Sequence, residues 1–167
     1  SDKMADEQAP KTKLQLPIIP LPICDVHTHL YDAAYTKDLE AVVARAASTN
    51  VHKIVLCNEN HETVEPLLNC VQQFPKIMFA CLGIHPCCIE SNAQVDDIIH
   101  KIKSQYASDP STNLIAIGEI GLDFTPKIIA DQLTRVAPKE PSVTTTDGLK
   151  ELQRTSLEKF IQLANEL

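Results

Sequence analysis

The stretch Cys24-Asp25-Val26-His27-Thr28-His29-Leu30 ends the first hydrophobic run of the chain, and the other motifs are best understood from it. In a β-strand alternate side chains point to the same face, so His27 and His29 project together while Val26 and Thr28 point to the opposite face. Two imidazoles on one face can chelate a divalent ion if later strands supply further ligands. The spacing alone is equally compatible with two partly exposed strand histidines.

The composition is that of one globular domain with an acidic surface. The chain has 167 residues, of which 44% are hydrophobic and 22% charged, and its formal net charge is −7. This balance argues against a broadly basic surface for duplex DNA or anionic lipid, so any nucleic-acid contact is expected to be local or metal-mediated. Pro17, Pro20 and Pro22 interrupt the apolar segment 14–23, so we expect no membrane-spanning helix there and no membrane partner.

The first residues and the cysteines bear on domain boundaries and compartment. The chain begins with polar and charged residues without periodicity, and we predict a disordered tail over residues 1–20 and one folded domain over residues 21–167. The six cysteines form no C-x-x-C pair and no finger-like spacing, which predicts free thiols. No secretory signal is recognisable before them, so we expect a reducing intracellular compartment, cytoplasmic or nuclear.

Four strand-like runs alternate with helical patterns along the chain. The predicted strands cover residues 22–27, 51–57, 77–82 and 114–118. This alternation predicts an α/β fold in which a parallel sheet is covered by helices. The segment Thr125–Thr146 is long and polar and contains three prolines, so we predict a loop there, followed by a final helix from Asp147 or Gly148.

Unusual polar residues collect where these strands end, and in parallel α/β folds active sites form at the carboxyl ends of strands. In chain order they are His27, His29, Asn58, Glu59, His61, His85, Glu119 and Asp123. Glu119 lies between Gly118 and Gly121, where a carboxylate can approach and bridge metal ions. The structural alternatives are an ion-paired strand-end carboxylate for Glu119 and a loop histidine for His85. For His61 a solvated position near a helix start is favoured.

Three ordered blocks also carry a family resemblance. Residues 25–30, 83–86 and 118–124 resemble the signature blocks of the TatD family of metal-dependent deoxyribonucleases. The resemblance implies a TIM-like (β/α) barrel of the amidohydrolase type, two divalent metal ions (Mg, Mn or Zn) and DNA as the substrate. The residues that it implicates are His27, His29 and Glu119 as metal ligands, Glu119 and His85 as catalytic groups, and Asp25, His85 and Asp123 close to the substrate or behind the ligands.

The family pattern also includes histidines after strands five and six and an aspartate after strand eight. The present sequence provides about the first four β/α units, so we expect the chain by itself to be a weak or inactive nuclease. A sheet of four strands has two open edges, through which we expect self-association.

Two other interpretations stay open. Other amidohydrolases and some phosphoesterases begin with His-x-His, although many amidohydrolases have a metal-bridging lysine where this chain has Glu119. The third possibility is a non-catalytic half-barrel that binds a partner or a full-length paralogue. Activity with added metal distinguishes this last possibility from the two enzymes.

Overall fold

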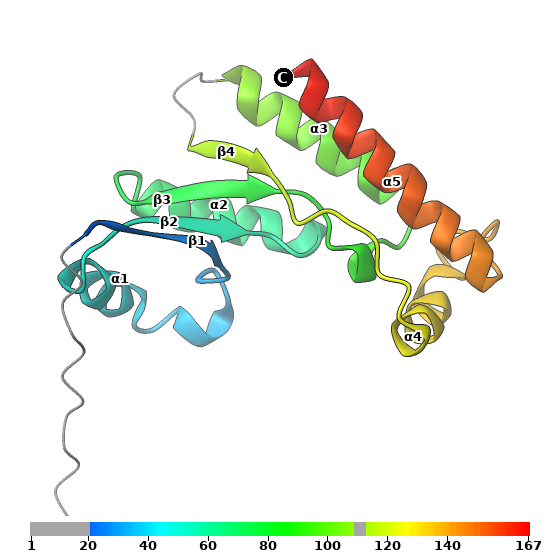
Figure 1. Ribbon diagram of the computed structural model, residues 1–167, viewed down its shortest axis with the longest axis horizontal. Helices are drawn as coiled ribbons and strands as arrows, with labels where there is room; N and C mark the ends of the chain where they lie inside the picture. Colours follow the sequence, from blue (N-terminus) through cyan, green and yellow to red (C-terminus); the bar gives the residue numbers. More distant parts are fainter. Residues whose placement is uncertain (1–20, 109–112) are drawn as a thin grey trace, which may run out of the picture.

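The computed structural model describes residues 21–108 and 113–167, so the predicted disordered tail at residues 1–20 lies outside the described residues. Four strands form one sheet in the order β1-β2-β3-β4, and every neighbouring pair is parallel (Figure 1). Their bounds are β1 Ile23–Thr28, β2 Val51–Cys57, β3 Met78–Leu82 and β4 Leu114–Ile117. The predicted parallel sheet is confirmed.

Each strand is followed by helix. The α-helices are α1 Leu39–Ser48, α2 Val64–Gln73, α3 Asn92–Ser108, α4 Pro126–Val136 and α5 Thr146–Glu166. Helices α3 and α5 run side by side (Figure 1), and ion pairs from Lys103 to Glu166 and from Lys159 to Asp96 join them. None of the described helices is long and apolar enough to cross a membrane.

The prediction of a continuous loop over residues 125–146 is wrong, because α4 occupies its first half. Pro126 is the first residue of α4, where its missing N–H and fixed φ are tolerated. Ile129, Leu133 and Val136 follow at helical spacing and pack on the core. The remaining position of that stripe is Gln132, a polar residue that interrupts the hydrophobic pattern of a helix.

The hydrophobic core lies between the sheet and the helices and is almost entirely aliphatic. The strands contribute Leu56 and Leu82, each 0% exposed, and α3 contributes Ile98 in the same state. The large aromatic of this core is Phe160 on α5, at 1% exposure. Burial of these side chains supplies the main driving force for the arrangement of the layers.

All four strands run in the same direction, so their carboxyl ends lie together at one end of the sheet, on the right in Figure 1. The segments that follow the strands at this end carry the polar residues singled out in the sequence. Strands β1 and β4 are the two outer strands, and among the described strands their outer edges have no partner. Apolar side chains are exposed on both, Val26 on β1 at 67% and Ile115 on β4 at 56%.

Candidate metal centre

Side chains from the first and last strands of the sheet converge at the carboxyl ends of the strands. His27 belongs to β1, His29 follows β1 by one residue, and Glu119 follows β4 by two. Potential ligand atoms of these three residues all lie within 4.8 Å of one another. The two Nε2 atoms are 3.3 Å apart, and Oε1 of Glu119 lies 3.4 Å from that of His27 and 3.6 Å from that of His29. The structure therefore brings together the three residues predicted as metal ligands.

The backbone of β2 fixes the orientation of His29. Its Nδ1 atom lies 2.9 Å from the carbonyl oxygen of Cys57 and 2.8 Å from the hydroxyl of Tyr31. The hydroxyl of Tyr31 also donates to the Cys57 carbonyl, at 2.9 Å. Because a carbonyl only accepts, we assign the proton of neutral His29 to Nδ1, which leaves the lone pair on Nε2 facing Glu119. This is the arrangement of a metal-binding histidine.

Glu119 supplies the clearest sign that the three residues fit a cation. Its Oε1 atom is buried, and within the described residues it has no hydrogen-bond partner. A buried acceptor without a partner is unfavourable unless something else compensates it. Ligands placed tetrahedrally around an ion at roughly 2.0–2.2 Å are roughly 3.3–3.6 Å from one another. The three separations observed here match that range, so the residues present fit a divalent ion.

Two residues after β2 and β3 hold the Glu119 backbone in place. Asn58 is fully buried, accepts from the Gly83 N–H at 2.8 Å and donates to the Gly83 carbonyl at 2.8 Å. The N–H of Glu119 donates to the backbone carbonyl of Asn58 at 3.4 Å. A Cβ at Gly83 would lie 2.8 Å from the carbonyl oxygen of Glu119, so glycine is needed for this close approach.

His85 is held in the opposite tautomer from His29. Its Nδ1 accepts from the backbone N–H of Cys87 at 3.2 Å, at the start of the short 3-10 helix η3 Pro86–Cys88. Neutral His85 therefore carries its proton on Nε2, which makes that atom a donor and not a metal ligand. The structure does not bring His85 into the group of three.

Asp123 lies beside the His85 turn. Its carboxylate accepts from the Thr125 N–H at 2.9 Å and from the Cys87 thiol at 3.3 Å. Hydrogen bonds from the Thr125 backbone and side chain, then from Cys87, together with the charge of His85, hold the pKa of Asp123 below its usual value. Burial, and next the hydrogen bond to Asp123, raise the pKa of the Cys87 thiol to about 11.

Asp25 is exposed, and its carboxylate lies 3.4 Å from the backbone N–H of His27. That contact connects Asp25 to the first of the three residues but leaves its side chain outside the group.

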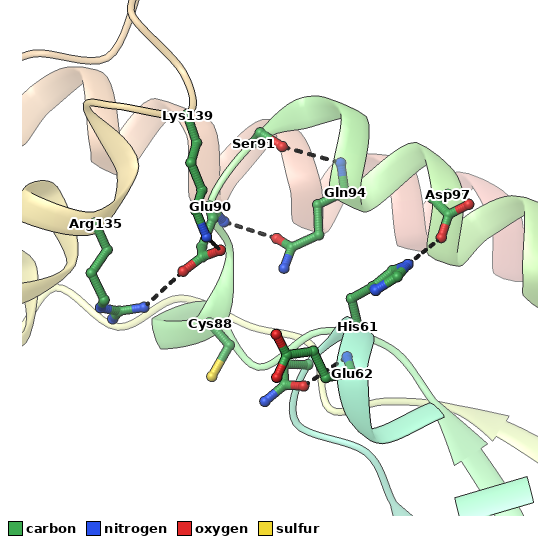
Figure 2. Close-up of a pocket in the computed structure, with 10 residues that line it drawn as sticks. His61, Glu62, Cys88, Glu90, Ser91, Gln94, Asp97, Arg135 and Lys139 are labelled. Atoms are coloured by element: carbon green, nitrogen blue, oxygen red, sulfur yellow. Dashed lines mark hydrogen bonds and ion pairs between the residues drawn. The ribbon is translucent and has the colours of Figure 1, made fainter. Parts of the chain in front are cut away.

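His61 lies on the wall of a separate cavity of about 430 Å³ between α3, α4 and the segments after β2 and β3 (Figure 2). Its Nε2 atom pairs with Asp97 at 2.5 Å. On the opposite side Glu90 pairs with both Arg135 and Lys139. Because the acidic side chains that line this cavity outnumber its arginine and lysine, it offers no net positive site for phosphate, and His61 lies outside the metal centre.

Four supporting residues are missed by the sequence reasoning. Tyr31 and Cys57 act on His29, while Gln132 and Gln153 are fully buried amides, of which Gln153 binds the Asp123 backbone. Tyr31 follows the histidine pair closely, which is a weak signal. Cys57 acts through its carbonyl oxygen, for which no side-chain pattern exists.

Comparisons with known proteins address the family of the chain. The family model described as TatD related DNase matches residues 24–167. Deoxyribonuclease TATDN3 of Homo sapiens is 28% identical over 150 residues, which are 87% of this chain and 48% of that protein. A metal-dependent hydrolase of Bacillus subtilis, YabD, is 30% identical over 66% of this chain and 43% of its own length.

A crystal structure of YJJV, a TatD homologue from Escherichia coli, superposes with a TM-score of 0.62 at 24% identity and covers 84% of this chain and 46% of its own. That likeness concerns the fold and agrees with the first part of a TIM-like barrel. The chain spans less than half the length of the curated relatives that it matches first. With the family model matching most of its residues, the chain belongs to the TatD-related DNase family.

Proposed function

We propose that the chain supplies the first ligands of a metal-dependent phosphodiesterase site that hydrolyses DNA. The observation that carries this proposal is the convergence of His27, His29 and Glu119 around a buried carboxylate oxygen without a hydrogen bond. The family membership and the names of the relatives, a deoxyribonuclease and a metal-dependent hydrolase, support the same reaction class.

In this proposal the three residues hold a divalent ion, either Mg, Mn or Zn. A bound ion of this kind activates water and neutralises charge on a scissile phosphate. His29 offers its Nε2 lone pair because Cys57 fixes the proton on Nδ1. Glu119 has a second carboxylate oxygen, through which it would bridge to a second ion.

His85 would contact the phosphate or the leaving oxygen through its Nε2–H. An N–H donor of this kind suits a phosphate oxygen, which only accepts. Contacts of this kind involve the phosphate and carry no base information. We therefore propose exonucleolytic trimming without sequence preference, in which metal ions and not a basic surface bind the strand.

Three donors are few for two ions, so we expect weak or no cleavage by the 167-residue chain alone. We also propose a reducing intracellular location, cytoplasmic or nuclear, which the six free cysteines support.

The test measures metal binding first and cleavage second. Mn²⁺ binding to the purified chain is followed by calorimetry, with His27→Ala and Glu119→Gln as variants and His100→Ala, an exposed α3 histidine, as the control. Wild type and control should bind Mn²⁺, and the two variants should not. A labelled single-stranded DNA then reports cleavage. Mn²⁺ binding that survives both substitutions would overturn the proposed site.

A further inference from the structure

Two glutamines are fully buried between α4, α5 and the segments that carry His85 and Asp123. Gln132 on α4 and Gln153 on α5 are each 0% exposed. The amide of Gln153 donates to the side-chain oxygen of Gln132 at 2.9 Å. A buried amide pair of this kind needs partners for its other polar atoms, and the structure supplies them.

Gln153 binds the backbone of Asp123 on both sides of the residue. The N–H of Asp123 donates to Oε1 of Gln153 at 2.9 Å, and Nε2 of Gln153 donates to the carbonyl of Asp123 at 3.2 Å. These two hydrogen bonds resemble those between paired strands and fix the backbone position of Asp123. The Asp123 carboxylate is then free to accept from Cys87 and Thr125.

Gln132 binds the turn that follows His85. Its Nε2 donates to the carbonyls of Pro86 and Ile89, both at 2.8 Å. One turn further along α4, Arg135 donates to the carbonyl of Cys87 at 2.9 Å. Helix α4 thus binds three carbonyls of the short segment whose Cys87 N–H orients the His85 ring.

Two apolar side chains of similar size would fill this space but would leave the backbone groups of Asp123, Pro86 and Ile89 without these hydrogen bonds. Buried polar networks contribute less to stability than to a single defined geometry, provided that every member is satisfied. Here the network joins two loops that contain groups expected to face the substrate. From these contacts we propose that Gln132 and Gln153 are positioning residues that hold the His85 turn and the Asp123 loop in one fixed arrangement for phosphate binding.

This inference rests on the proposed function for its purpose, although the network itself can be measured without any nuclease activity. In this proposal α4 and α5 both support the site, because each helix contributes one of the two amides. Neither glutamine touches the substrate in this proposal; each acts through a backbone segment.

The experiment uses the full chain with Gln132→Met and Gln153→Met, which keep side-chain length and remove the amide. Ser156→Ala is the matched control: Ser156 is buried on α5 at 1% exposure and bonds only to the Leu152 carbonyl of its own helix at 2.7 Å. NMR then follows the titration of the Asp123 carboxyl and the hydrogen exchange of the Cys87 N–H. Gln153→Met should move the Asp123 titration towards higher pH, and Gln132→Met should speed exchange at Cys87.

A second measurement follows binding of a four-nucleotide phosphorothioate DNA in the presence of Mn²⁺. Both Met variants should weaken binding about tenfold, the effect of a small displacement of a phosphate-binding group, and the control less than about twofold. If Ser156→Ala shifts the Asp123 titration and Cys87 exchange as much as the Met variants, the network is only structural and the proposal falls. If the wild-type chain does not bind the DNA, the proposed function fails, and the NMR data still decide the positioning role.

Discussion

Oε1 of Glu119 faces Nε2 of His27 across 3.4 Å, and the described residues offer this oxygen no hydrogen bond. The two side chains come from opposite sides of the sheet and lie within ion-pair distance of each other without a hydrogen bond. The parallel sheet brings them together, and their chemistry suits a cation between them.

We expect Glu119→Gln to separate stability from metal binding. Without metal the variant should be as stable as wild type or more stable by about 1 kcal/mol, because a poorly compensated buried charge is removed. With Mn²⁺ the wild type should gain roughly 2.7 kcal/mol at a hundred times its Kd, and the variant should gain nothing. Thermal unfolding with and without the ion measures both effects. Strong destabilisation of the metal-free variant would contradict this account.

Tyr31→Phe should weaken metal binding without removing a ligand. Burial raises the pKa of Tyr31 to about 12, so its hydroxyl stays protonated and supports both His29 and the Cys57 carbonyl. Loss of such a supporting hydroxyl lowers affinity by about tenfold. Calorimetry of Mn²⁺ binding checks this, with Tyr35→Phe as the exposed control. Equal affinities for the two variants would mean that Tyr31 does not support His29.

Gly83→Ala should disturb both fold and site. The added Cβ would meet Glu119 O and Gly118 C at 2.8 Å, so backbone has to move. We expect a loss of about 1–3 kcal/mol in urea denaturation and weaker Mn²⁺ binding. Gly121→Ala is the matched control, because its Cβ would meet nothing closer than Pro86 at 4.0 Å. Equal stability of the two alanine variants would show that the Gly83 contact is not limiting.

The Cys87 thiol should be protected from alkylation in a pH-dependent way. Its pKa rises from the ordinary 9.0 to about 11, because of burial and then of the bond to Asp123. Stability from this group is present below pH 9 and is lost as pH rises towards 11, since the unfolded thiol ionises first. Because the thiolate reacts, alkylation at pH 9 should be roughly fiftyfold slower than in the unfolded chain. Peptide mass spectrometry measures the rate, which Asp123→Asn should increase; an unchanged rate would exclude the carboxylate as a cause.

The two open edges of the sheet should lead to self-association of the 167-residue chain. Val26 on β1 and Ile115 on β4 are exposed at these edges, and unpaired edges pair with other chains. Val26→Lys and Ile115→Lys should each weaken association about tenfold through the burial of a charge. Light scattering coupled to size-exclusion chromatography measures this over a concentration series, with Tyr35→Lys as the control. A monomer at all concentrations would contradict the expectation.

The sheet and the group of three could be predicted because each depends on a repeated local signal. Apolar runs marked the strands, and the parallel order then placed the residues after β1 and β4 at one edge. Within this arrangement, contacts from Asn58 and Gly83 hold the Glu119 backbone.

Features that depend on a distant partner could not be predicted. Helix α4 was missed because the polar Gln132 interrupts its hydrophobic pattern. Burial of Gln132 is favourable only because Pro86, Ile89 and Gln153 hydrogen-bond to it. Asn58 looked like one more polar strand-end residue, and its role follows from Gly83, twenty-five positions away. Such pairings leave no periodic trace in a sequence.

The hydrogen bond from His29 to residue 57 ends on a main-chain oxygen. No substitution at position 57 can delete that acceptor, although it can shift it. Substitutions at position 57 therefore keep the acceptor, whereas a one-residue shift in the register of β1 against β2 would turn the imidazole of His29 away from it. The orientation of His29 thus depends on the register of β1 against β2. An error in this register during folding would therefore lower metal affinity more than a change of any one supporting side chain.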